Sequence, residues 1–231
     1  EKILASANSL LVTSVSVGLA TGLYGISFGA LSVAAGLDVW QTCVLSLLMF
    51  SGGSQFAFVG VISGGGVAAI PAAIASAWMM GVRNGFYAVA MAPILQLRKT
   101  RRVVGAQLTI DESTGVALSQ TETEKQKYGF WATGISVFVF WNLLTLLGAL
   151  LGELMSDPSV WGLDAAAAAA FVALVWPRLN DSPTRVVAVL AFAVSILSSP
   201  YVPQGVPVLL AGLVAVVVWA IGATRNQDGE S

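Results

Sequence analysis

Arg83 has the position in this chain that points most directly to a chemical role. It is the only basic residue within the long apolar segment 66–95. A charge in hydrocarbon is energetically unfavourable, so Arg83 is expected to face other protein groups or a water-filled cavity. Its guanidinium offers a planar fork of N–H donors that fits a carboxylate. The alternative is that the segment ends early and Arg83 extends to the membrane surface beside Phe86 or Tyr87.

A second candidate site is the run Ser51-Gly52-Gly53-Ser54-Gln55, which interrupts another apolar segment. A helix break here would expose backbone N–H and C=O groups, which are tolerated at membrane depth only beside protein or water. Broken helices of this kind form substrate sites in many transporters. Small residues also allow close helix packing, with Gln55 bonding to a neighbouring helix. The amide of Gln55 favours the first interpretation, because close packing does not need it.

Two further patterns have both a structural and a functional interpretation. Gly18, Gly22, Gly25 and Gly29 recur on one face of a predicted helix, which is typical of a packing seam. Tyr24, Ser27 and Phe28 lie around that face and could line a cavity. The acidic pair Asp111-Glu112 follows an apolar stretch, and Asp111 is predicted to cap a helix that continues through Leu118. Asp111 and Glu112 also remain candidates for gating or cation coupling.

The composition excludes several classes of protein. Of 231 residues, 56% are hydrophobic and 10% are charged, against about 25% charged in a soluble domain. Histidine is absent, which excludes HExxH metalloproteases and histidine proton relays. Cys43 is the single cysteine, and the four lysines lie in polar segments, so a disulfide and a retinal Schiff base are also excluded.

No P-loop motif occurs in the chain, so direct ATP drive is not expected. The net charge of −1 does not indicate nucleic acid as a partner. We therefore predict neither enzymatic activity nor a cofactor or metal.

Apolar runs of spanning length predict an all-α polytopic membrane protein with a single transmembrane domain over residues 1–231. The seven expected spans lie near 10–35, 39–62, 66–95, 131–155, 161–176, 184–199 and 206–222. A break or a strong tilt is expected in the third span, where Gly81, Arg83, Asn84 and Gly85 interrupt it. The last three spans are short and bounded by prolines.

The distribution of basic residues predicts the orientation of these spans. The polar loop 96–130 holds six of the eleven Lys and Arg residues, so it is expected in the cytoplasm. The alternation of charge across the four later spans agrees with this assignment. Three spans before the loop place residue 1 outside. Lys2 is the only basic residue near this end, so the charge distribution gives little evidence on the side of the N-terminus.

Four ordered motifs carry a resemblance to a known family. They are Gly25-Ile26-Ser27-Phe28-Gly29, Phe50 to Phe56, Arg83-Asn84 with Tyr87, and Leu108 to Ser113. With these stretches the chain resembles the AzlC family of branched-chain amino acid permeases, most strongly over residues 22–118. The resemblance implies export of valine, leucine, isoleucine or related apolar amino acids. It also implies a small AzlD-like membrane subunit as partner and a location in the plasma membrane.

The candidate residues are chemically compatible with such a substrate. A zwitterion needs donors for its carboxylate, acceptors for its ammonium group and an apolar slot. Donors and acceptors could come from Arg83, Asn84 and the broken helix, and the slot from phenylalanines such as Phe50 and Phe56. The alternative is a membrane assembly subunit without a transport path, or a passive channel. The predicted substrate-binding residues are Gly52, Gly53, Ser54, Gln55, Arg83, Asn84, Ser27 and Phe28.

Overall fold

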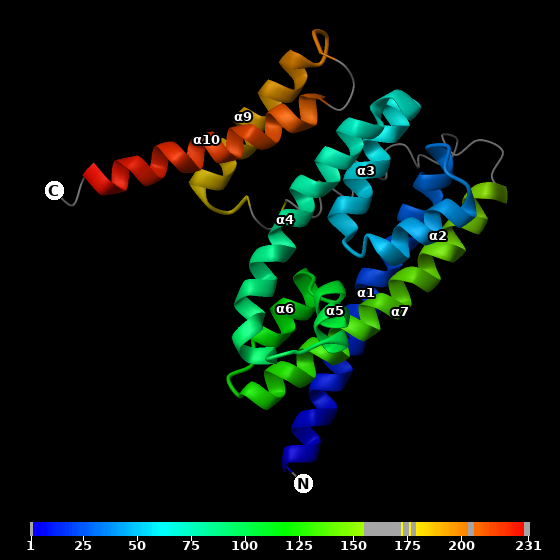
Figure 1. Cartoon of the computed structure of the whole chain (residues 1–231), viewed down its shortest axis with the longest axis vertical. Helices are drawn as coiled ribbons and strands as arrows, with labels where there is room; N and C mark the ends of the chain where they lie inside the picture. Colours follow the sequence, from blue (N-terminus) through cyan, green and yellow to red (C-terminus); the bar gives the residue numbers. More distant parts are fainter. Residues whose placement is uncertain (1, 155–171, 173–175, 177–178, 203–205, 229–231) are drawn as a thin grey trace.

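The chain is an all-α membrane protein. We describe a computed structural model over residues 2–154, 172, 176, 179–202 and 206–228, within which every regular element is a helix (Figure 1). Most of the expected span 161–176 lies outside these residues. The elements are α1 (Lys2–Ala34), α2 (Val39–Leu48), α3 (Gly52–Gly65), η1 (Gly66–Ala69), α4 (Ile70–Leu95), α5 (Thr100–Gln107), α6 (Asp111–Leu118), α7 (Thr123–Leu154), α9 (Ser182–Ser198) and α10 (Val206–Asp228).

Three stretches of helix in the described part of the chain are long and apolar enough to cross a bilayer. They are Asn8–Ala34 in α1, Gly52–Leu95 through α3 and α4, and Thr123–Leu154 in α7. Shorter apolar helices are Val39–Leu48, Ser182–Ser198 and Val206–Val218. About 20 residues are needed for one crossing, so α2, with 10 residues, is too short to cross an average bilayer. Helices α9 and α10 have 17 and 23 residues, which is in the range of one crossing.

Helices α1 and α7 run parallel to each other and pack from Leu10 beside Gly129 to Ala30 beside Gly152. Near their N-terminal ends, the hydroxyl of Thr133 donates a hydrogen bond of 3.0 Å to Ser14. Further along, a Cβ added at Gly18 would lie 2.6 Å from Ser136 Cβ, and one added at Gly29 would overlap the backbone of Thr145. The expected glycine packing seam on α1 is therefore confirmed, and it lets two backbones approach closely.

Helix α4 runs in the opposite direction. Its N-terminal end belongs to a buried cluster in which Ala69 and Ala73 pack near Leu37, just beyond the C-terminal end of α1. Its C-terminal end leads to Leu97, which together with Trp131 of α7 borders Gly105. The three long helices thus alternate up, down and up, as Figure 1 shows.

Residues 39–62, expected as one crossing, form a hairpin instead. Helix α2 ends at Leu48 and α3 begins at Gly52. The tip lies halfway along α7, where the ring of Phe50 meets that of Phe138 at 5.0 Å. At its far end α3 returns to the starting point of α2, because Val61 and Ile62 share a cluster with Ala35 and Leu37.

This hairpin changes the expected topology of the N-terminal half. Because α2 and α3 enter and return on one side, the start of α1 lies at the same end of the molecule as residues 96–99 and 119–122 (Figure 1). Hydropathy did not reveal the hairpin, since two short apolar helices have the same window average as one spanning helix.

The segment 96–130, expected as a loop, contains a second and smaller hairpin. It is formed by α5 and α6 and approaches from the opposite end of the long helices (Figure 1). Helix α6 packs on α7: Val116 borders Gly129 and Leu108 borders Gly134. Leu108 and Ile110, just before the acidic pair, are buried, and so are Ser113 and Ala117 after it.

Helix α4 is continuous through Gly81 and Gly85, so the expected break at this place is wrong. The irregular turn comes earlier, at η1, where Gly66 has a φ of 57° that favours glycine. Gly81 instead permits close approach of α3, since an added Cβ would lie 3.3 Å from Ser54 Oγ.

Helices α9 and α10 pair with each other, and Met79 of α4 contacts Gly212 of α10.

Candidate functional site

The first part of the site is the helix break at the tip of the α2–α3 hairpin. Ser51 is extended, with φ −157° and ψ 105°, and the helical hydrogen bonds resume at Gly52. The side chain of Gln55 bridges this break. Its Nε2 donates to Met49 O at 2.6 Å, and its Oε1 accepts from the indole Nε1 of Trp141 at 2.9 Å. Gln55 is fully buried. Its amide therefore has a structural role, because it connects the residues before the break to α3 and α7.

A second glutamine connects the two hairpins. Gln107, the last residue of α5, donates from Nε2 to Leu47 O at 2.8 Å and to Leu48 O at 3.4 Å. These carbonyls belong to the last turn of α2 and lack helical partners, because α2 ends at Leu48. The tips of both hairpins are therefore held together by a side chain.

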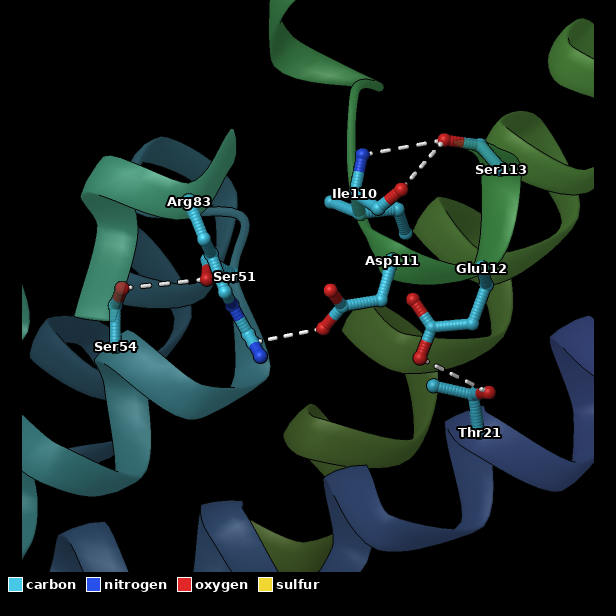
Figure 2. Close-up of polar contacts among 8 residues, drawn as sticks. All are labelled: Thr21, Ser51, Ser54, Arg83, Ile110, Asp111, Glu112 and Ser113. Carbon is cyan, nitrogen blue, oxygen red and sulfur yellow. Dashed lines mark hydrogen bonds and ion pairs between the residues drawn. The ribbon is translucent and has the colours of Figure 1, made fainter. Parts of the chain in front are cut away.

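The second part of the site is the N-terminus of α6. Ile110 is extended and serves as the residue before the helix, so Asp111 is the first helical residue rather than the predicted cap. Ser113 Oγ accepts from Ile110 N at 3.1 Å (Figure 2). It donates to Leu108 O at 2.6 Å. This local bonding fixes the turn and directs the side chains of Asp111 and Glu112 toward α4 and α1.

A pocket of about 170 Å³ lies between these two parts. Both α3 and α6 begin at its wall, with Gly52 and Asp111. The N-terminal end of a helix carries partial positive charge and free N–H groups, which favour a bound anion. Gly52 and Gly53 keep the wall open, because a Cβ at Gly53 would lie 2.9 Å from Arg83 Nη2. The lining residues are Thr21, Tyr24, Phe50, Ser51, Gly52, Gly53, Phe56, Arg83, Asn84, Ile110, Asp111, Glu112, Val137 and Trp141.

Arg83 and Asp111 form an ion pair at the pocket wall. Arg83 Nη2 lies 2.8 Å from Asp111 Oδ2, and the two side chains are 25% and 26% exposed (Figure 2). Three other polar atoms at this place are buried without a hydrogen-bond partner: Arg83 Nε, Asn84 Oδ1 and Asp111 Oδ1. Buried polar groups are normally paired, so this donor and these two acceptors are exceptions that cluster beside the pocket.

Glu112 points away from Arg83, toward α1. Its Oε1 accepts a hydrogen bond of 3.5 Å from the hydroxyl of Thr21 (Figure 2). Glu112 lies on α6, outside the three spanning stretches. Burial, and to a lesser degree the neighbouring charge of Asp111, raise the pKa of this carboxyl above its usual value; its own backbone N–H and the charge of Arg83 oppose the shift.

Comparison with known proteins places the chain in a family. A sequence model described as AzlC protein matches residues 16–155, which is more than half of the chain. The chain belongs to the AzlC family. It is thus a membrane protein of the AzlC/AzlD permease type, as the sequence motifs indicated. No curated protein and no solved structure matches it.

The pocket of this AzlC protein lies within the matched region, since its lining residues run from Thr21 to Trp141. The structure brings six of the predicted site residues to the pocket: Gly52, Gly53, Arg83, Asn84, Asp111 and Glu112. Their elements are distant in sequence, so this convergence depends on the two hairpins.

Four predicted substrate-binding residues lie outside the pocket lining. Gln55 holds the break, and Ser54 Oγ donates to Ser51 Oγ at 3.2 Å. Phe28 is fully buried and packs against the rings of Phe56 and Trp141. Ser27, its neighbour on α1, also does not line the pocket.

Sequence reasoning missed Thr21 and Trp141. Thr21 precedes Gly25 by one helical turn, so its position on the face of the glycine seam was a usable signal. Trp141 lies in the apolar span of α7 directly before Asn142, and its residue type and spacing alone do not distinguish it from a lipid-facing tryptophan. Its role follows only from its bond to Gln55.

Proposed function

We propose that this AzlC protein is a secondary transporter that exports branched-chain or similar apolar amino acids from the cell across the plasma membrane. We also propose that it works with a small AzlD-like membrane subunit and that the pocket is its substrate site. The observation that carries the proposal is the set of three unpaired buried atoms: Arg83 Nε, Asn84 Oδ1 and Asp111 Oδ1. One donor beside two acceptors is the complement of an amino acid zwitterion.

Each part of the zwitterion has a suitable partner in the pocket. Arg83 Nε and the N-terminal ends of α3 and α6 suit the carboxylate, which accepts hydrogen bonds and carries negative charge. Asn84 Oδ1 and Asp111 Oδ1 suit the ammonium group, which has three N–H donors. The rings of Phe50, Phe56 and Trp141 supply an apolar surface for the side chain.

This arrangement predicts which molecules compete with leucine for the site. Its 2-oxo acid analogue lacks the ammonium group and leaves Asp111 and Asn84 unpaired, and isoamylamine lacks the carboxylate. Leaving buried polar groups unpaired costs about 1–3 kcal/mol. We expect each analogue to compete at least about tenfold more weakly than leucine, since about 1.4 kcal/mol is tenfold. Equal competition by isoamylamine would contradict a carboxylate site.

The test of function is counterflow of labelled leucine in vesicles, with and without the small subunit. Arg83→Ala is expected to abolish counterflow while membrane insertion remains normal. Arg83→Lys should also lose most activity, because a fork becomes a point charge. The matched control is Arg185→Ala, since Arg185 is exposed on α9 and bonds only locally to Ser182. Normal counterflow by Arg83→Ala would remove the proposed anchor, and flux without counterflow would indicate a passive channel.

A further inference from the structure

The ionisable groups of the pocket are unbalanced in charge. Its lining includes one basic side chain, Arg83, and two carboxyls, Asp111 and Glu112; Tyr24 is the remaining ionisable group. Asp111 already pairs with Arg83 at 2.8 Å. The lining residues from α3 and α7, which are Gly52, Gly53, Phe56, Val137 and Trp141, carry no ionisable group. An ionised Glu112 therefore has no basic partner among the residues that line the pocket.

In the empty pocket no positive group compensates this imbalance, because Arg83 pairs with Asp111. An unpaired charge in a partly buried site is unfavourable, so a cation should accompany Glu112 when no positive group is near. The described residues contain no group of three or more His, Cys, Asp or Glu side chains that could hold a metal ion. A proton needs only one carboxyl oxygen and fits the site better than a metal does.

We propose that Glu112 is a proton-binding residue that couples export to a proton gradient, an inference that rests on the proposed function. With the pocket empty and open to the outside, the carboxylate of Glu112 takes up one proton and becomes a neutral carboxylic acid. When the pocket opens to the cytoplasm and an amino acid binds, the O–H bond breaks and the proton leaves to that side. One proton thus enters the cell for each amino acid that leaves.

The position of Glu112 beside Asp111 provides the coupling. Under the proposed function the substrate ammonium group binds at Asp111 Oδ1, one residue away on the same helical turn. Its positive charge favours the ionised form of Glu112, so substrate and proton compete although they bind different atoms. Coupling of this kind is reciprocal: whatever substrate does to proton affinity, the proton does to substrate affinity. Thr21, which bonds Glu112 from α1, is a positioning residue for the carboxyl.

The experiment measures binding of labelled leucine to the purified full-length protein, with its small subunit, between pH 5 and 9. For the wild type we expect the leucine Kd to rise by up to about tenfold for each pH unit below the pKa of Glu112, as linkage with one proton requires. In weakly buffered solution, leucine should release up to one proton per molecule bound. Glu112→Gln should show a Kd independent of pH and no proton release, whatever its absolute affinity.

Two further variants make the result decisive. Glu122→Gln is the control, because Glu122 is an exposed carboxyl paired with Lys125, and it should keep the wild-type pH profile. Glu112→Asp retains a titratable group and should release protons with a shifted midpoint, which covers the case that Glu112→Gln does not fold. A pH-independent Kd in the wild type, or a wild-type profile in Glu112→Gln, would overturn the inference but leave the transporter function standing. No leucine binding by the wild type at any pH would overturn the proposed function itself.

Discussion

Trp141 Nε1 donates a hydrogen bond of 2.9 Å to Gln55 Oε1 and so ties the middle of α7 to the first turn of α3. The same amide donates to Met49 O at 2.6 Å across the helix break. Through these two bonds the Gln55 side chain bridges the break and orients the indole of Trp141, which lines the pocket. This relationship makes the break a fixed structure rather than a loose loop.

Gln55→Ala should therefore act mainly on stability. It leaves the indole N–H of Trp141 buried and unpaired, at about 1–3 kcal/mol, while Met49 O keeps its hydrogen bond from Ser51 N. We expect a loss of several degrees in the melting temperature of the purified protein and a lower yield. Gln120→Ala is the control, because the Gln120 side chain donates to Ser119 Oγ at an exposed place and the substitution keeps the backbone bonds. An unchanged melting temperature together with a weakened leucine Kd would place Gln55 in the substrate site instead.

Added bulk at Gly53 should block the pocket. A Cβ there would lie 2.9 Å from Arg83 Nη2 and 3.0 Å from Met80 Cε, and a larger side chain would fill the space beside the ion pair. Gly53→Leu is expected to weaken leucine binding by at least about tenfold, equivalent to 1.4 kcal/mol. Gly60→Leu, on the same helix but with open space around it, should bind normally. Binding is measured per folded molecule, and similar affinities for the two variants would contradict the pocket assignment.

The seam between α1 and α7 should tolerate no side chain at Gly29. An added Cβ would overlap Thr145 O and approach Ala149 N, both of which are backbone atoms that do not move aside. Gly29→Ala should destabilise the protein by about 1–3 kcal/mol, as overpacking does. Gly85→Ala, in α4 with open space at its Cβ, is the matched control and should be neutral or slightly stabilising. Thermal unfolding in detergent compares the two, and equal melting temperatures would speak against the seam.

The hairpin topology has a test that does not depend on knowing which side is the cytoplasm. If α2 and α3 enter and return, Ala34→Cys and Val67→Cys react with a membrane-impermeant maleimide from the same side. If residues 39–62 cross, they react from opposite sides. Both positions are exposed, and Cys43→Ser provides the background. Thr100→Cys should react from the other side, and the positive-inside rule predicts that this is the cytoplasm.

Several features of the site followed from the sequence alone because they depend on local chemistry. The glycines and serines from Ser51 to Ser54 predicted a break, since such residues do not sustain a helix in an apolar run. The spacing from Gly18 to Gly29 predicted a packing face, and the helix of Asp111 to Leu118 was expected within one residue. Arg83 was expected in a protein-lined cavity for energetic reasons, and it lies at the pocket wall.

Only the tertiary structure decided what these residues do together. Hydropathy reports how apolar a segment is and not where the chain turns back, so the α2–α3 hairpin was indistinguishable from a crossing. The antiparallel course of α4 brings Arg83 to Asp111, 28 positions away, and the parallel course of α7 brings Trp141 to Gln55, 86 positions away. Such contacts depend on the directions of whole helices, which no local spacing encodes. The pocket between two helix N-termini exists for the same reason, because each hairpin supplies one of them from an opposite end of the molecule.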